Sequence, residues 1–340
     1  MNDDTRHDYL WDGSGEPDAE VARLEALLAP YRHRRALPPL PAREAPPRRR
    51  AMAIGLQFAA AAASLALVTA AAWSAAALRP SGWNVESLAG APSVAGSRLN
   101  SRSRLPVGAL MTTDAGSRAR LDVALIGVVD VEPNSRVRLI ASRPGERRLA
   151  LDRGGISARI WAPPGNFFVN TPSSTAIDLG CAYRLDVDDD GRGTVHVDSG
   201  WVAFEYNGHE SFIPKGAICL TRPGFGPGTP WYEDAPAGIA DALTILDFSS
   251  TDDVRRPRAL ETILAAARPR DALTLWHLLS RGTTAERARV YDRMAVLAPP
   301  PQGVTREAVI NGNRAALDAW WNTLGLDSAS WWRIWKTPWK

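Results

Sequence analysis

Residues 170–202 read NTPSSTAIDLGCAYRLDVDDDGRGTVHVDSGWV, and this stretch carries the strongest fold signal in the chain. Apolar and polar side chains alternate over Ala182–Val187 and again over Gly193–Val197, and the Asp- and Gly-rich stretch Asp188–Gly193 separates the two runs. Alternation with a period of two is typical of strands that bury one face, and Asp and Gly are typical of turns. The stretch therefore predicts two neighbouring β-strands joined by a turn.

The same pattern extends in both directions, from Trp83 to about Arg222. Asn207-Gly208 is a strong hairpin signal, because both positions of a two-residue turn require a positive φ. Turn residues recur throughout, and no long helical pattern interrupts the region, so residues 83–230 are predicted to form an all-β domain, as a sandwich, barrel or solenoid. Further alternating runs are Ala119–Ile126, Val137–Ile140, Gly155–Trp161 and Trp201–Tyr206.

Six residues of this region match a known family pattern in order and spacing: Thr171, Pro172, Ala176, Gly180, Gly200 and Val202. On these residues the chain resembles the FecR family, whose pattern is roughly T-P-x-x-x-A-x-x-x-G-T-x-F-x-V followed by V-x-x-G-x-V. Cys181 stands where Thr is usual, and Tyr183 stands where Phe is usual. The resemblance covers roughly residues 90–220.

The resemblance implies a single-pass regulator with an extracytoplasmic β domain, of the kind that often acts with an extracytoplasmic-function sigma factor. The matching positions are mostly turn glycines and strand residues, so they imply a fold more strongly than an activity. In well-known relatives the distal end meets an outer-membrane receptor. The resemblance ends before the C-terminal region of this chain, so that partner does not follow here.

Residues 51–78, AMAIGLQFAAAAASLALVTAAAWSAAAL, contain no charged side chain. As a helix they would extend roughly 42 Å, which is enough to cross a hydrocarbon core of about 30 Å. Arg48, Arg49 and Arg50 flank the start, and only Arg79 follows the end, so the positive-inside rule places residues 1–50 in the cytoplasm and the rest outside. A buried soluble helix and a cleaved signal peptide are the alternatives. The fifty residues that precede the segment are too many for a signal peptide.

The cytoplasmic segment, residues 1–50, divides into an acidic and a basic half. Residues 1–25 hold eight acidic residues and two Arg, whereas residues 26–50 hold seven Arg and one Glu. The spacing of apolar residues predicts one short helix over Pro17–Ala29, followed by a proline-rich linker. Its apolar face is the candidate partner-binding site, and the alternative is a frayed tail that only precedes the span. The face consists of Val21, Leu24, Leu27 and Leu28.

No constellation in the chain indicates catalysis, a cofactor or a metal. Asp186–Gly191 resembles the opening of a calcium loop, but Val197 occupies the position of the required Glu, so a hairpin turn is the better interpretation. Cys181 and Cys219 would lie outside the membrane, where disulfides persist, and a bridge or two independent buried thiols are both open. The five His residues have no metal-ligand spacing, and the sequence predicts no enzyme.

Beyond about Pro236 the apolar period becomes helical. Short helices with brief connections predict an all-α domain of stacked helical hairpins over residues 236–328. Residues 329–340 are a basic tail rich in Trp, which either folds back onto this domain or binds a membrane surface or partner. The predicted helices are Arg258–Ala267, Ala272–Ser280, Ala285–Leu297, Arg306–Asn311 and Arg314–Leu324, with Asp271, Thr284 and Thr305 as N-caps and a core of Leu275, Trp276, Leu278, Leu279, Tyr291 and Leu317.

The composition fits this multidomain interpretation. The chain has 340 residues with a net charge of +3, which gives no footprint for direct nucleic-acid binding, and its two Cys exclude a disulfide-rich scaffold. The sequence predicts a mainly β plus α protein with one transmembrane helix, a FecR-type sandwich or solenoid and a C-terminal helical domain. It would sit in a bacterial inner membrane and bind a cytoplasmic sigma factor and an extracytoplasmic protein or envelope ligand. The alternative is an anchored envelope binding or assembly module with no signalling role.

Overall fold

The computed structural model describes residues 9, 15–32 and 82–326. Its contacts divide the chain into two units, Met1–Ser74 and Ala75–Lys340. In the first unit the described structure is helix α2 (Ala19–Leu28), followed by the short 3-10 turn η1 (Ala29–Tyr31). Asp18 caps α2, because its Oδ1 accepts hydrogen bonds from the backbone N–H groups of Glu20 and Val21 at 2.7 and 3.2 Å.

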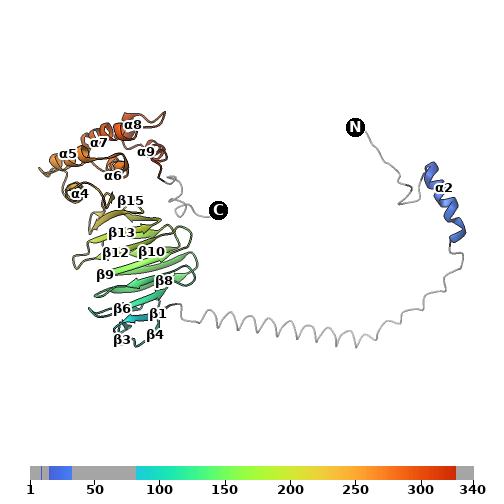
Figure 1. Ribbon diagram of the computed structural model, residues 1–340, viewed down its shortest axis with the longest axis horizontal. Coiled ribbons are helices and arrows are strands. Elements are labelled where there is room, and N and C mark those ends of the chain that lie inside the picture. Colours follow the sequence, from blue (N-terminus) through green and yellow to red (C-terminus); the bar gives the residue numbers. More distant parts are fainter. Residues whose placement is uncertain (1–8, 10–14, 33–81, 327–340) are drawn as a thin grey trace. The chain divides into compact units, whose positions relative to one another are not determined.

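The second unit is mainly a β structure whose strands hydrogen-bond into one 18-stranded sheet (Figure 1). The sheet consists of two ladders that share the long strand β9 (Glu146–Ile160). In the first ladder the order is β4 (Arg102–Pro106), β1 (Gly82–Ala89), β6 (Arg118–Asp122), β7 (Gly127–Val131), β9, β12 (Ala182–Val187), β13 (Gly193–Ser199) and β16 (Ala217–Arg222), which pairs with both β17 (Gly226–Pro227) and β18 (Trp231–Tyr232). In the second ladder the order is β3 (Ser97–Arg98), β2 (Ser93–Val94), β5 (Leu110–Thr112), β8 (Arg136–Arg143), β9, β10 (Phe167–Asn170), β11 (Thr175–Asp178), β14 (Trp201–Tyr206) and β15 (His209–Pro214).

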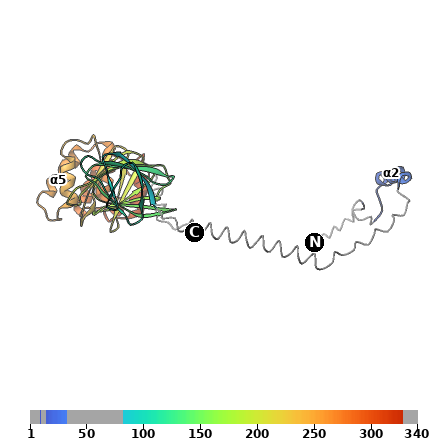
Figure 2. The same cartoon turned by 90° about the horizontal axis from the view of Figure 1, so that it is seen from below.

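Strand β9 joins the two ladders by bending at Gly154. Its first half pairs with β8 and, in parallel, with β10, whereas its second half pairs with β7 and β12. Gly154 has φ +87°, and a Cβ there would lie 2.3 Å from the Ser135 Oγ, so only glycine fits this close approach. The bend thus joins the two ladders into one half-barrel, whose strands overlap when seen from below, along the stack (Figure 2).

The hairpin signals of the sequence are confirmed. β14 and β15 are antiparallel neighbours, and the turn between them has φ +49° at Asn207 and +81° at Gly208. The Asp-rich stretch before Gly193 is also a turn, between β12 and β13, in which the Asp188 Oδ1 accepts hydrogen bonds from the N–H groups of Asp190 and Arg192 at 2.9 Å each. No group of carboxylate, imidazole or thiol side chains in the described ranges is arranged to hold a metal ion.

Helices follow the last strand. They are α4 (Ile239–Phe248), α5 (Arg256–Ala266), η2 (Pro269–Asp271), α6 (Ala272–Leu279), α7 (Thr284–Leu297), α8 (Arg306–Ile310) and α9 (Arg314–Trp321). The predicted core residues of this region are buried, apart from Tyr291, which is half-buried against the core. The sequence missed α4 and misplaced one cap: α7 begins after Thr283, not Thr284, because Thr283 and Glu286 form a reciprocal capping box. Trp320 and Trp321 lie on a helix as expected, whereas the tail 329–340 is outside the described residues.

The prediction of a separate all-α domain of helical hairpins is wrong. One continuous hydrophobic core runs from Trp83 in β1 to Trp320 and Trp321 in α9. Among the described residues the longest C-terminal helix has 14 residues. The apolar residues of these helices share the hydrophobic core of the sheet. The Trp321 ring lies 6.0 Å from that of Trp201 in β14 and 6.1 Å from that of Phe212 in β15. Strands and helices of residues 82–326 therefore form one body.

Buried polar groups reinforce the junction between helices and sheet. The Arg281 guanidinium donates to the carbonyl of Pro227 and to the Ser211 Oγ, both at 2.6 Å. The carboxylate of Asp247 in α4 accepts from the N–H and Oγ1 of Thr229 at 2.6 and 2.8 Å. In α6, the His277 Nε2 accepts the N–H of Phe212 at 3.0 Å, while its Nδ1 lies 2.8 Å from the carbonyl of Leu273. Each of these groups is paired, as most buried polar groups are.

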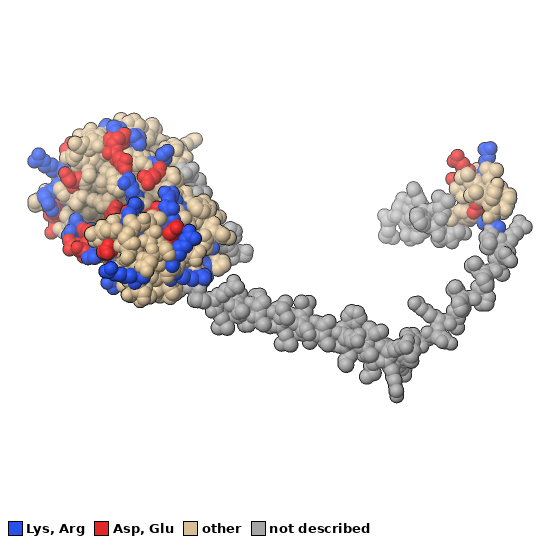
Figure 3. Space-filling model, turned by 60° about the horizontal axis from the view of Figure 1, so that its bottom comes forward, with Lys and Arg blue, Asp and Glu red and all other residues tan. Residues whose placement is uncertain are grey.

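The one transmembrane helix of the predicted fold class is also not supported by the described residues. No helix among the described residues is long and apolar enough to span a membrane, and the predicted span 51–78 lies outside them. On the face in Figure 3, acidic and basic side chains are interspersed. Ion pairs between neighbouring strands, such as Arg118 with Glu132 at 2.9 Å, join some of the opposite charges of the sheet.

Candidate functional site

Helix α2 presents the four residues that the sequence assigns to a partner. Leu24, Leu27 and Leu28 are each more than half exposed, and Val21 is half-buried. No residue of α2 is buried. The helix therefore places all four side chains where a partner can reach them, and exposed leucines at helical spacing are typical of a helix that docks into an apolar groove. Whether a partner binds them stays a prediction.

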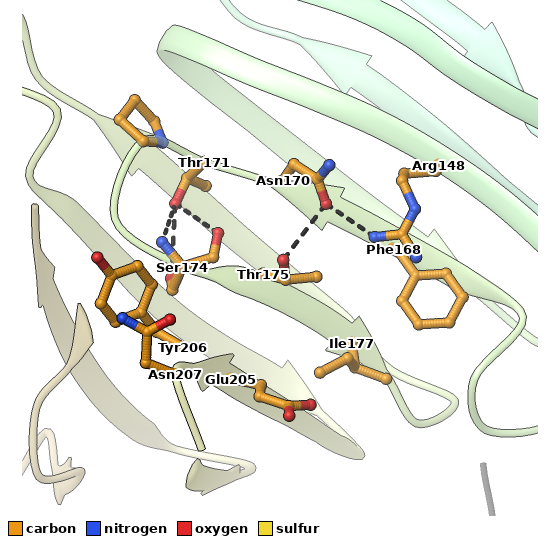
Figure 4. A pocket seen from close by; sticks show the side chains of 11 residues that line it. Arg148, Phe168, Asn170, Thr171, Ser174, Thr175, Ile177, Glu205, Tyr206 and Asn207 are labelled. Atoms are coloured by element: carbon orange, nitrogen blue, oxygen red, sulfur yellow. Dashed lines mark hydrogen bonds between the residues drawn. The ribbon is translucent and has the colours of Figure 1, made fainter. Parts of the chain in front are cut away.

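A second candidate site is a groove of about 520 Å³ on β10, β11 and β14, which we call the strand groove (Figure 4). Strand register places its side chains in rows across the sheet. Arg148 lies opposite Phe168, and Phe168 lies opposite Ile177. Asn170 lies opposite Thr175, which in turn lies opposite Glu205. The sheet thus fixes polar and aromatic side chains on rigid elements.

Contacts within the strand groove orient its wall. The Arg148 guanidinium stacks on the Phe168 ring, 4.3 Å from its centroid, and donates to the Asn170 Oδ1 at 2.8 Å. The Thr175 Oγ1 lies 3.4 Å from the same oxygen. Tyr206 and Asn207 line the opposite wall (Figure 4). This lining offers hydrogen-bonding groups and aromatic surface, which suits non-covalent binding.

Of the six residues that match the FecR pattern, Thr171 and Pro172 line this groove. Thr171 closes a tight turn: its Oγ1 accepts the N–H of Ser174 at 3.0 Å and donates to the carbonyl of Ser174 at 2.9 Å. Pro172 follows in that turn and lines the groove. Gly180 and Gly200 both have positive φ, and a Cβ on Gly200 would lie 2.2 Å from the Gly180 carbonyl oxygen.

The other two motif residues lie on the paired strands β11 and β14. Ala176 is opposite Phe204, Val202 is opposite Asp178, and both motif residues are buried. The six positions are spread along β11, the turns at its two ends and the paired strand β14, and their contacts are structural.

The sequence did not identify a buried carboxyl, that of Asp178, beside these turns. The carboxyl of Asp178 is buried and accepts hydrogen bonds from the Gly180 N–H at 2.7 Å and the Cys181 Sγ–H at 2.8 Å. Burial raises the pKa of Asp178 to about 7, and burial together with this carboxyl raises the pKa of the Cys181 thiol. The Tyr183 hydroxyl, also buried, has no hydrogen-bond partner in the described structure. An Asp-x-Gly sequence usually indicates an exposed turn, so no local signal distinguishes this one.

Of the two alternatives left open for Cys181 and Cys219, the structure has the two independent thiols and not the bridge. Both thiols are free and buried. Cys219 on β16 pairs with Val195 on β13, which pairs with Leu185 on β12, whereas Cys181 precedes β12. Two strand spacings alone separate the Cα atoms by roughly 10 Å, beyond the approximately 7 Å that a disulfide allows. Burial raises the pKa of Cys219 to about 12, so this thiol is unreactive at neutral pH.

Comparison with known proteins gives limited results. No protein-family model matches the chain. No curated protein matches it. Two crystal structures of "a putative anti-sigma factor from Parabacteroides distasonis ATCC 8503", at 1.65 and 2.50 Å, match with a TM-score of 0.33 and 16% identity. They cover 39% of this chain, which spans only 63% and 62% of theirs. The chain is similar in part to these structures, and membership of the FecR family is not confirmed.

Proposed function

We propose that this chain is a membrane-anchored regulatory protein that relays an extracytoplasmic signal to a cytoplasmic partner by binding alone, without enzymatic chemistry. Residues 1–50 lie in the cytoplasm, residues 51–78 cross the bacterial inner membrane, and the body that begins at β1 lies outside. The partner of α2 is an extracytoplasmic-function sigma factor. The strand groove takes the extracytoplasmic ligand, and the chain does not bind nucleic acid directly.

The observation that carries this proposal is the isolated apolar face of α2. A ten-residue helix is marginal in water because nucleation is costly, and α2 buries none of its own residues. Its leucines gain stability only when another surface covers them. A charge-free segment of 28 residues separates this helix from the independently packed body. This arrangement suits a protein that binds on both sides of a membrane.

The test is recovery of a sigma factor with the tagged full-length chain, solubilised from membranes in mild detergent. We compare the wild type with Leu24→Asp/Leu28→Asp and with Ala22→Asp/Ala26→Asp. The second pair adds the same charge at the same spacing on the opposite face of α2, which is also exposed. Burial of two leucines contributes a few kcal/mol, so we expect roughly tenfold or greater loss of the sigma factor for the leucine pair only.

Failure takes a distinct form. If the wild type recovers no sigma factor above the leucine pair, α2 is not a docking helix. The chain is then an anchored envelope module whose cytoplasmic arm only sets its topology. Equal loss in both variants would mean that the added charges, and not the leucine face, disrupt binding.

A further inference from the structure

Two large apolar side chains stand exposed together at one edge of the sheet. Leu125, at the tip of the β6–β7 turn, is 91% exposed, and Trp161, directly after β9, is 65% exposed. The Trp161 indole N–H donates to the carbonyl of Leu125 at 3.0 Å, and the Trp161 backbone N–H donates to that of Ile126 at 2.9 Å. We call this pair the Leu125–Trp161 tip. Its two hydrogen bonds hold both side chains on a fixed frame.

The tip lies beside the point where the chain enters the body. β1 runs antiparallel to β6 with Asn84 opposite Asp122, so Gly82 lies level with the turn that carries Leu125. Gly82 and Trp161 also line one hollow of about 420 Å³. This adjacency follows from strand register and does not depend on side-chain rotamers.

Only three residues, Arg79, Pro80 and Ser81, connect Gly82 to the end of the charge-free segment 51–78. Four fully extended residue steps span at most about 14 Å. The tip is therefore tethered within a short distance of that segment. If the segment crosses a membrane, the tip lies within reach of the lipid headgroups, which extend roughly 5–7 Å beyond the hydrocarbon core on each side.

The chemistry of the tip suits this location. Trp is enriched at membrane–water interfaces because its ring is amphipathic, and an exposed Leu beside it adds apolar surface. Arg104 lines the same hollow and donates to the carbonyl of Gly82 at 3.4 Å. In the described part of the chain it makes no ion pair, so its remaining N–H groups are available to a phosphate. Figure 3, which brings the β1 end forward, shows uncharged surface there, bordered by Lys and Arg with Asp and Glu interspersed.

We infer that the Leu125–Trp161 tip docks into the outer-leaflet interface of the membrane next to the anchoring segment, with Arg104 toward lipid phosphates. This inference rests on the proposed membrane anchor. Docking at a second point beside the anchor would restrict rotation of the body and present the strand groove in a defined orientation. The tip binds a lipid surface. The experiment below distinguishes this from binding of a protein partner at the same place.

The structure supplies a matched pair of probe positions. Leu125 and Val254 are 91% and 90% exposed, and Val254 lies between α4 and α5, at the opposite end of the body from β1 (Figure 1). The two native thiols are buried, so a polarity-sensitive maleimide dye labels an introduced surface thiol selectively. We label Leu125→Cys and Val254→Cys in the full chain, reconstituted in phosphatidylethanolamine–phosphatidylglycerol vesicles, and add lipids spin-labelled at the headgroup.

We expect the Leu125→Cys label to emit at shorter wavelength and to lose emission to the spin-labelled lipid, while the Val254→Cys label shows neither change. Trp161→Ser should reverse the effect at the first position, because it removes the interfacial anchor without changing the anchoring segment. Carbonate extraction separates the two hypotheses. A chain that carbonate releases overturns the membrane anchor and this inference together. A chain that resists extraction while both labels behave alike overturns the docked tip alone, and leaves the surface to a protein partner.

Discussion

Two buried titratable side chains, Asp178 and His277, make opposite contributions to the pH dependence of the free energy of unfolding. Burial raises the pKa of the Asp178 carboxyl to about 7. Burial, assisted by the nearby Arg281 guanidinium, lowers the pKa of His277 to about 3. Between about pH 4 and 6.5 the folded state keeps a proton on Asp178 that the unfolded chain loses, and lacks one on His277 that the unfolded chain gains. The two contributions to the free energy of unfolding therefore have opposite slopes and nearly cancel.

Single substitutions should expose each slope. In Asp178→Asn, stability relative to the wild type should rise by about 1.4 kcal/mol per pH unit from pH 4 to about 7, because only the wild type must keep a buried carboxyl protonated. In His277→Gln, whose amide oxygen can still accept the Phe212 N–H, stability relative to the wild type should fall over pH 4–6.5 with a similar slope. Urea unfolding of the full chain in detergent across pH 4–8 measures both. If the free energy of unfolding of a variant followed the same pH dependence as that of the wild type, the replaced group would not have a shifted pKa in the folded state.

Single residues also show what the sequence can and cannot predict. Gly180, Gly200 and the Asn207-Gly208 pair were readable as turn positions, because a positive φ is a local requirement. The burial of Asp178 could not be predicted, because it depends on the pairing of β11 with β14, which lies some 25 residues later in the chain. The two thiols illustrate the same limit. Their compartment suggested a bridge, but strand order sets their separation.

At the scale of elements, strand β9 is the feature that the sequence described least well. Its second half was expected as a strand, but its first half was not, because Gly154-Gly155 indicates an end and not a bend. A hydrogen bond to Ser135 stabilises the bend: the Gly155 N–H donates to the Ser135 Oγ at 2.9 Å. The half-barrel depends on this contact, which is made between residues twenty positions apart.

Substitution at the bend should therefore be far more costly than at an ordinary turn glycine. Gly154→Ala places a methyl group 2.3 Å from the Ser135 Oγ and 2.4 Å from its Cα, in a backbone with φ +87°. Overpacking and left-handed strain together should lower the free energy of unfolding by about 2–5 kcal/mol. Gly145→Ala is the control: φ is +79°, but nothing lies within 4 Å, so only about 1 kcal/mol of strain is expected. Urea midpoints compare the two, and equal losses would show that the close approach to Ser135 does not constrain β9.

At the scale of the whole molecule, the change of period after Pro236 was interpreted as a domain boundary. The positions of most helices were predicted correctly, but the prediction that they form a separate domain was wrong. A helical pattern shows which face of a helix is apolar and does not show what covers that face. Here strand residues cover it. Phe212 contacts both His277 and Trp321, with ring centroids 6.2 and 6.1 Å apart. The strands that carry the strand groove and the C-terminal helices therefore belong to one body.

A shared core predicts one cooperative unfolding transition for the body. Trp276 in α6 is buried, donates its indole N–H to the carbonyl of Leu317 at 2.7 Å and packs 4.6 Å from the Trp321 ring. Trp276→Ala should lower the free energy of unfolding by about 3–5 kcal/mol, whereas Val296→Ala, at an exposed position of α7, should change it by less than about 0.5 kcal/mol. Hydrogen exchange of the full chain in increasing urea, followed by mass spectrometry, reports β14–β15 and α6–α7 separately. In Trp276→Ala both regions should lose protection at the same lowered urea concentration. Helices that lose protection while the strands keep theirs would show that the C-terminal region is a separate domain after all.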